Sequence, residues 1–158
     1  MTLMEIMKAG SPILKQRAEK VTRFDKKLAK LLTNMKETMY EAEGCGLAAP
    51  QVGISKRLMV IDAFDDFGLR EFINPEFISK EGKCVNAEGC LSVPDYEGEV
   101  ERATNVTVKY QDRKGQWHML EAEGLLAMAL QHETDHLDGV LFIDKALSLV
   151  PKVKEEKL

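Results

Sequence analysis

Residues 130–139 read LQHETDHLDG and contain two of the three histidines of the chain, His132 and His136, with Glu133 beside the first. On a helix, side chains four residues apart lie on one face, so both imidazoles can bind a single ion. A divalent metal bound by imidazole at about 2.0–2.1 Å lowers the pKa of its water towards about 7, and a neighbouring carboxylate can accept the remaining proton. The stretch therefore predicts a hydrolytic metal site with Glu133 as its general acid/base.

A catalytic metal site generally has three protein ligands and one open position, so a third ligand is needed. One candidate is a downstream carboxylate, because Glu155 and Glu156 follow His136 at a spacing close to that of thermolysin-like peptidases. The other is Cys90 in NAEGCLSVP, where a glycine-flanked thiolate can approach a metal. We favour Cys90, because the charged end of the chain, PKVKEEKL, is typical of a solvated terminus.

Two segments have helical periodicity. Over residues 22–43, apolar residues recur every three or four positions, with Asp25 near the start and Gly44 as the stop. The pattern returns over residues 124–137, and Gly139 stands where a left-handed C-cap is expected. We therefore predict a long N-terminal helix and a C-terminal helix that carries the HExxH motif.

The middle of the chain is typical of strands. RLMVID, REFINP and a longer run over residues 99–111 have strand patterns, and Lys114 with Gly115 predicts a hairpin turn before His118, which we expect to be structural or exposed. The order predicts an α+β fold, with antiparallel or mixed β-sheets surrounding the C-terminal helix. We expect one domain over residues 1–158, ending in a short charged tail from about residue 147.

Composition restricts the class of protein. The chain has 158 residues, 44% of them hydrophobic, and a net charge of −4, which argues against broad binding to nucleic acid. Three cysteines are an odd number and argue against a disulfide framework. No apolar run approaches the ~20 residues that span a bilayer, and the N-terminus lacks the pattern of a signal peptide. We expect a cytoplasmic protein that is a monomer and has no membrane partner.

Three stretches, read together, resemble peptide deformylase, the metal hydrolase that removes the formyl group from the N-terminal methionine of new polypeptides. They are GCGLAAPQ at residues 44–51, EGCLS at residues 88–92 and QHETDHLDG at residues 131–139. The resemblance extends over nearly the whole chain and implies a deformylase-like fold. It also implies N-formylmethionyl nascent polypeptides as substrates, in a reaction that releases formate.

The resemblance implies a role for each matching residue. Cys90, His132 and His136 would bind one divalent metal, for which Fe²⁺ is expected and which Zn²⁺, Ni²⁺ or Co²⁺ can replace. Glu133 would be the general acid/base, and the Gln51 amide with the backbone N–H of Leu91 would form the oxyanion site. The methionine side chain of the substrate would be bound by a group of pocket residues: Cys45, Gly46, Gly89, Leu125, Met128 and Ala129.

Residues around this set have less definite roles. Glu88 and Arg102 are expected to pair and hold the Cys90 strand, and Asp135 to orient a ligand or cap the hairpin. Residues 95–98 are acidic where some relatives carry a basic residue, which leaves open the preference beyond methionine. The chain also ends soon after the motif, without a long basic helix, so only a transient contact with the ribosome is expected.

Two other functions fit the HExxH motif. The nearest is a metallo-endopeptidase, which would use a carboxylate as its third ligand, and the other is a non-catalytic metal-binding module. After His136, however, there is little chain left to build the second lobe with which such a peptidase holds a polypeptide.

Overall fold

The computed structural model describes residues 3–152, which form helices and two antiparallel sheets. The five-stranded sheet has the order β1 (Gly46–Ala48), β2 (Leu58–Asp62), β3 (Leu69–Glu81), β6 (Asn105–Gln111) and β7 (Trp117–Glu123). The three-stranded sheet has the order β4 (Cys84–Cys90), β5 (Val93–Arg102) and β8 (Ser148–Pro151). Because all named strand pairs are antiparallel, the predicted α+β class is confirmed without any mixed sheet.

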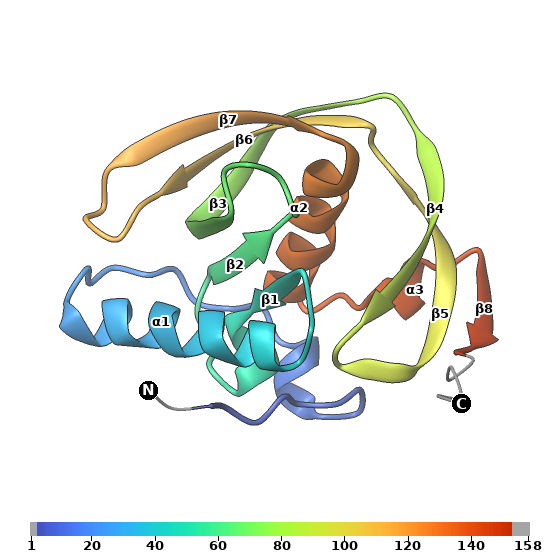
Figure 1. The fold of residues 1–158 in the computed structure, drawn as a ribbon, viewed down its shortest axis with the longest axis horizontal. Coiled ribbons are helices and arrows are strands. Elements are labelled where there is room, and N and C mark those ends of the chain that lie inside the picture. The colour runs from blue at the N-terminus through green and yellow to red at the C-terminus, as the bar shows by residue number, and fades with distance from the viewer. Residues whose placement is uncertain (1–2, 153–158) are drawn as a thin grey trace.

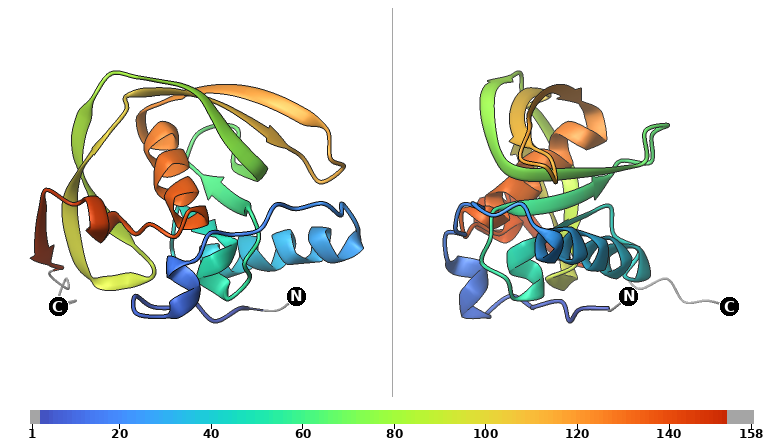
Figure 2. Two further views of the ribbon diagram at one scale, coloured as in Figure 1. Left: turned by 180° about the vertical axis from the view of Figure 1, so that it is seen from behind. Right: turned by 90° about the vertical axis from the view of Figure 1, so that its left-hand side faces the viewer.

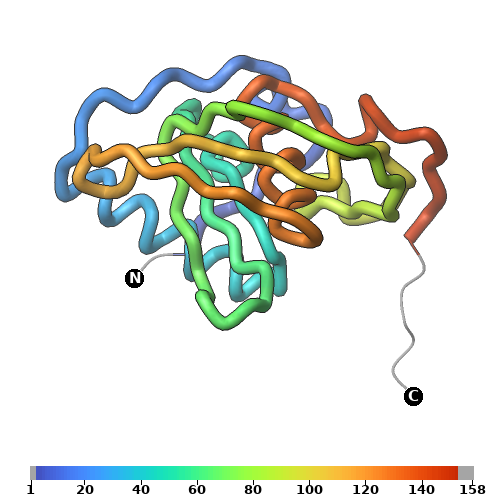
Figure 3. Tube along the Cα trace, turned by 90° about the horizontal axis from the view of Figure 1, so that it is seen from above, coloured from blue at the N-terminus to red at the C-terminus, as the bar shows by residue number. Residues whose placement is uncertain are grey.

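The helices are α1 (Lys26–Glu41), α2 (Gly124–Leu137) and the short α3 (Phe142–Lys145), with 3-10 turns η1 (Pro12–Lys15) and η2 (Ala49–Val52). Helix α2 stands in the middle of the molecule, with the β6–β7 hairpin above it and the β4–β5 hairpin to one side (Figure 1). The view from behind shows the same central position (Figure 2). Seen from above, β6 and β7 run side by side across the molecule (Figure 3).

Strand β2 explains how the five-stranded sheet joins two hydrophobic clusters. Successive strand residues point to opposite faces. Met59 and Ile61 therefore pack in the cluster that contains Leu130 of α2, while Leu58 and Val60 pack in the cluster of α1. All four side chains are fully buried. The apolar run LMVI thus reflects a strand that is covered on both faces. Its contacts on one face hold α2 against the sheet.

Helix α1 is capped by a side chain at its start and by backbone hydrogen bonds at its end. The Asp25 carboxylate accepts a hydrogen bond from Leu28 N–H at 3.0 Å, a cap that typically contributes about 1 kcal/mol. At the other end, Glu43 N–H donates to Tyr40 O and Gly44 N–H donates to Met39 O. The left-handed residue of this terminus is Glu43, with φ 58°, one residue before the predicted stop Gly44. The helix is also shorter at both ends than the predicted range.

Helix α2 ends in the same type of motif, here with glycine. Gly139 has φ 78°, Gly139 N–H donates to His136 O and Val140 N–H donates to Asp135 O. A Cβ at this position would also lie 2.6 Å from Lys15 O, so a side chain has no room. Glycine at this position therefore allows both the positive φ of the turn after the two histidines and its close approach to the backbone of Lys15.

Two boundaries predicted from the sequence are wrong. The run over residues 99–111 is two strands in different sheets, because β5 ends at Arg102 and β6 begins at Asn105. The expected charged tail from residue 147 instead begins with β8, which pairs with β5. The last part of that tail, including Glu155 and Glu156, lies outside the described residues. Within residues 3–152, no helix combines the length and the apolar character needed to cross a membrane.

Candidate metal centre and active site

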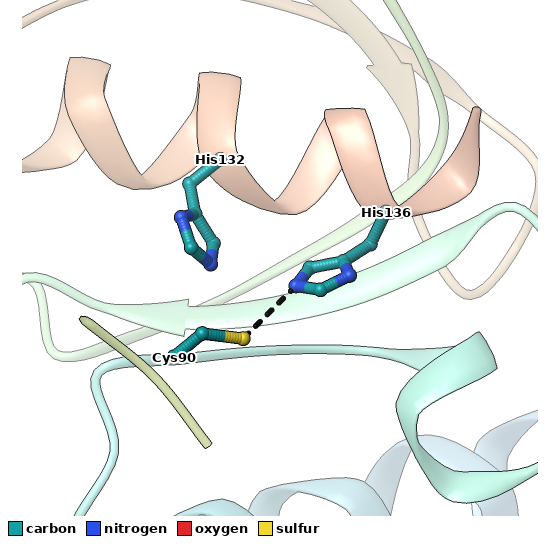
Figure 4. Close-up of side chains that lie close together, drawn as sticks. All are labelled: Cys90, His132 and His136. Atoms are coloured by element: carbon teal, nitrogen blue, oxygen red, sulfur yellow. Dashed lines mark hydrogen bonds between the residues drawn. The ribbon is translucent and has the colours of Figure 1, made fainter. Parts of the chain in front are cut away.

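Helix α2 and the end of β4 bring three metal-binding side chains together. His132 and His136 lie one helical turn apart, with ring centroids separated by 5.1 Å. Cys90 is the last residue of β4, and its Sγ lies 3.3 Å from His136 Nε2 (Figure 4). Their ligand atoms all lie within 4.8 Å of one another. This spacing suits two imidazole nitrogens and a thiol sulfur as the ligands of one divalent ion.

His132 is oriented by a buried ion-pair network. Its Nδ1 lies 2.9 Å from Glu88 Oε1, which leaves Nε2 for the cluster. Arg102 donates two hydrogen bonds to Glu88, both of 2.9 Å, and one of 2.6 Å to Asp135, which in turn accepts from Lys145. Burial alone would raise the pKa of Glu88, but the hydrogen bonds from Arg102 and His132 lower this pKa to about 2. Glu88 therefore stays ionised and fixes the ring of His132.

The electrostatics of the two histidines suit a bound cation. Burial lowers the pKa of His136 well below its usual range, so this imidazole is neutral and able to act as a ligand. Burial also lowers the pKa of His132, but the charge of Glu133 and interactions with Cys90 and Glu88 outweigh it and raise this pKa. The surroundings of His132 thus favour positive charge, which a metal ion would supply. Together with a thiolate, these donors fit a divalent transition metal.

Glu133 lies beside the cluster in a state suited to proton transfer. Its Oε2 is 4.0 Å from His132 Nε2, and its Oε1 is buried without a hydrogen-bond partner among the described residues. Burial raises the pKa of Glu133 to about 7. A carboxyl group with this pKa can both accept and donate a proton near neutral pH.

Gly46 provides the space that Glu133 occupies. A Cβ at Gly46 would lie 2.6 Å from Glu133 Oε2 and 3.0 Å from its Cδ and Cγ. Gly44 has a similar relation to Leu91, whose Cδ1 would be 2.7 Å from an added Cβ. The glycines of this loop are therefore needed for close packing on two residues of the predicted site.

Gln51 and Leu91 lie on turns that face the same cavity. Gln51 lies in η2, where its Oε1 accepts from Ala48 N–H at 2.9 Å. This bond turns Nε2 towards Ser92 Oγ at 3.1 Å and Cys90 Sγ at 3.6 Å. Leu91 lies with Ser92 in the two-residue turn between β4 and β5. An amide side chain and a turn thus lie next to the metal-binding cysteine.

A cavity of about 370 Å³ opens in front of these residues. Glu133, Gln51, Leu91, Cys90 and His132 line it. All six predicted pocket residues also line it, namely Cys45, Gly46, Gly89, Leu125, Met128 and Ala129. Burial raises the pKa of Cys45, so its thiol is neutral and acts as part of the wall. The three motifs therefore form one site, with His136 buried behind it.

Comparison with known proteins identifies the family. A family model described as polypeptide deformylase matches residues 3–152. The chain belongs to the peptide deformylase family. It is 54% identical over 149 residues to the peptide deformylase of Halothermothrix orenii, across 94% of this chain and 97% of that protein. As a peptide deformylase it is an enzyme, a hydrolase.

Solved peptide deformylases have the same fold. The crystal structure from Thermotoga maritima matches with a TM-score of 0.90 and 44% identity, and the match covers 94% of this chain and 100% of that one. A peptide deformylase from Synechococcus elongatus in complex with actinonin matches with a TM-score of 0.87 and 43% identity. That match covers 92% of this chain and 79% of the other.

Some residues of the deformylase cavity were not predicted from the sequence. Glu43, Ala87, Pro94 and Lys152 also line it. Glu43 directly precedes the GCGLAAPQ motif and Pro94 follows the EGCLS motif. Extending each motif by one or two residues would therefore have included them. Lys152 had no such signal, because it follows a strand where the sequence predicts a charged tail. The expected pairing of Glu88 with Arg102 is present, and Asp135 extends it.

Proposed function

We propose that this protein removes the formyl group from the N-formylmethionine of newly synthesised polypeptides and releases formate. One observation carries the proposal: the buried carboxylate of Glu133 lies beside His132 of the Cys90, His132 and His136 cluster, and Glu133, Cys90 and His132 line a single cavity. Membership of the peptide deformylase family supports the same reaction. A general base next to a metal-binding group is the arrangement that metal-assisted amide hydrolysis uses.

We propose Cys90, His132 and His136 as the ligands of one divalent metal, with Fe²⁺ as the resident ion and Zn²⁺, Ni²⁺ or Co²⁺ able to replace it. The soft thiolate of Cys90 with two imidazoles is a donor set suited to these ions. When bound, such an ion supplies Lewis-acid activation of water and of the formyl carbonyl. The Cys90 thiolate also makes the site sensitive to oxidation.

Glu133 moves the proton in the proposed mechanism. Its unpartnered Oε1 accepts a proton from the water that attacks the formyl carbon, and returns it to the departing amine. The pKa of about 7 allows both steps at neutral pH. Glu133 is thus the base in the first half of the reaction and the acid in the second.

Gln51 and Leu91 stabilise the charge that develops on the formyl oxygen. Gln51 Nε2 and the Leu91 backbone N–H are the proposed hydrogen-bond donors. Donors that are fixed before the reaction typically stabilise a transition state by about 3–4 kcal/mol each. The hydrogen bond from Ala48 N–H to Gln51 Oε1 supports this role, because it holds the amide in one orientation.

The cavity wall is proposed to bind the methionine side chain. The lining residues Cys45, Leu125, Met128 and Ala129 are apolar or neutral, and Gly46 and Gly89 leave room for substrate backbone. Burial of one methionine side chain would contribute roughly 1.5–3 kcal/mol to binding. Leu125 is 42% exposed, so it has surface to offer a ligand.

The substrate class also suggests the setting of the enzyme. We propose that it acts as a cytoplasmic monomer on chains that emerge from the ribosome, with at most transient ribosome contact. Light scattering at micromolar concentration tests the monomeric state, and cosedimentation with ribosomes at low salt tests the contact.

The decisive experiment measures formate release from formyl-Met-Ala-Ser by protein loaded with Fe²⁺ under anaerobic conditions or with Ni²⁺. We expect turnover with the metal and none after chelation. Full metal occupancy without turnover would refute the proposed function. A Glu133→Gln protein is the matched control, because it keeps the three proposed ligands and lacks the base.

A further inference from the structure

Two side chains of opposite charge stand at the rim of the cavity and have no role in the proposed reaction. Glu43 and Lys152 both line the cavity, and both are exposed. Glu43 lies between α1 and β1, whereas Lys152 directly follows β8 of the other sheet. The opening is therefore lined by one exposed acidic and one exposed basic side chain, which come from different parts of the fold.

Backbone pairing fixes Lys152 at the rim. Strand β8 pairs with β5, with Tyr96 opposite Pro151, and Lys152 N–H donates to Asp95 O at 2.8 Å. The neighbouring β5 side chains Asp95 and Glu97 are acidic, but no ion pair joins either of them to Lys152. Within residues 3–152, Lys152 is the only lysine or arginine that lines the cavity. Among the residues that the structure describes, its ammonium group has no ion-pair partner, which leaves it for a ligand.

Glu43 is fixed by the end of α1. Its N–H donates to Tyr40 O, and it adopts the left-handed conformation with φ 58°, which glycine would adopt more easily. The carboxylate of Glu43 takes part in no ion pair with a described residue. The chain therefore carries a glutamate at a position where the backbone conformation would favour glycine.

A polypeptide substrate has to leave the cavity past this rim. Side chains of an extended peptide alternate between its two sides. The two residues that follow the formylmethionine therefore point in opposite directions, one towards each side of the opening. If those two substrate residues are one acidic and one basic, opposite charges on the two sides would favour one order of them along the peptide over the reverse order.

We propose that Glu43 and Lys152 determine the charge preference at the residues that follow formylmethionine, with Lys152 binding an acidic side chain and Glu43 a basic one. This inference rests on the proposed deformylase activity. It assigns the preference beyond methionine to residues from the α1–β1 loop and from the C-terminal strand. Neither residue takes part in the chemical step.

The test compares two isomeric peptides, formyl-Met-Glu-Lys-Ser and formyl-Met-Lys-Glu-Ser, by their kcat/KM for formate release. Both have the same net charge, so long-range attraction to the protein cancels in the ratio. Exposed ion pairs change an equilibrium by about 1.5- to 5-fold each, so the two pairs together predict a ratio of about 2 to 25 at low salt. At about 0.5 M salt the ratio should approach one, because exposed charges are screened.

A charge swap gives the sharpest variant. Combining Glu43→Lys with Lys152→Glu keeps the net charge and should invert the ratio, and Lys152→Gln alone should bring it towards one. The matched control combines Lys114→Glu with Glu121→Lys, both on the β6–β7 hairpin, and should leave the ratio unchanged.

The outcomes separate the two proposals. A wild-type protein that hydrolyses formyl-Met-Ala-Ser but treats the isomeric peptides alike refutes the role of the rim and leaves the deformylase activity intact. A charge swap that does not change the ratio refutes the role of the rim in the same way. A metal-loaded protein that hydrolyses no formylated peptide refutes the activity, and the role of the rim with it.

Discussion

Replacing Gly46 by alanine should remove most of the activity while leaving the metal in place. The added Cβ would lie 2.6 Å from Glu133 Oε2, whereas ordinary Cβ contacts begin at 3.4 Å. The carboxylate must therefore move by about 0.8 Å. A misplacement of ~1 Å in a catalytic group can cost ~100-fold in rate. We expect kcat for formate release to fall about 100-fold, equivalent to roughly 2.7 kcal/mol of transition-state stabilisation.

The same substitution should affect folding much less. Gly46 does not have a positive φ, and the atoms that the Cβ would meet are at the end of a side chain. Metal content should be unchanged, because the three atoms nearest to the added Cβ all belong to Glu133, which is not a proposed ligand. Metal analysis and thermal unfolding establish that the variant is intact, and single-turnover kinetics measure the chemical step.

Gly89→Ala is the matched control, since it adds the same methyl group at the cavity where no atom lies within 4 Å. Any effect of that variant should appear in KM, through contact with the substrate, and not in kcat. If Gly46→Ala keeps wild-type kcat with full metal content, the carboxylate position does not limit the reaction, and the reasoning is refuted.

Other substitutions test the metal centre and its support. Glu133→Ala should retain the metal and lose about 10²–10⁴-fold in kcat, and metal loss in that variant would contradict its role as a base. Cys90→Ala should weaken metal affinity, measured by competition with a chelator. The loss should exceed the ~10–100-fold that follows from removing a residue that only supports a ligand. Unchanged affinity would mean that another residue is the third ligand. Arg102→Met should lower the free energy of unfolding in urea by about 3–5 kcal/mol, because it leaves the buried Glu88 carboxylate without its cation. Because the folded pKa of Glu88 is about 2 and its usual value is 4.5, its ionised form stabilises the fold above pH 4.5, and this contribution of ~3 kcal/mol is lost as pH falls towards 2. In Glu88→Gln, the metal-free protein should lack that part of the acid dependence of Tm.

The histidine pair could be predicted from the sequence because its geometry is local. Side chains four residues apart on a helix meet whatever the rest of the fold does. Cys90 is 42 residues before His132 and lies on a strand, so no local pattern places it beside α2. The preference for Cys90 over the downstream carboxylates therefore depends on the charged character of the terminus and on the resemblance to a known family.

The elements that the sequence did not predict have weak local signals. All four residues of β8 are exposed, so no alternation of buried and exposed positions marks it as a strand. Its place is set by hydrogen bonds to β5, which no local pattern encodes. The predicted stop of α1, Gly44, is one residue too late, because Glu43 takes the left-handed position that follows the end of the helix at Glu41. Both errors lie next to the rim of the cavity, because Glu43 follows α1 and Lys152 follows β8.

The N-terminal segment has a role that its sequence does not indicate. Met7 N–H donates to Gln51 O at 2.6 Å, and Ala9 N–H donates to Ser92 O at 2.8 Å. Ser92 Oγ in turn accepts from Gln51 Nε2. One extended segment therefore joins the two turns that carry the proposed oxyanion donors. Because such donors are effective only when they are fixed before the substrate arrives, these backbone bonds connect the start of the chain to the chemistry at its centre.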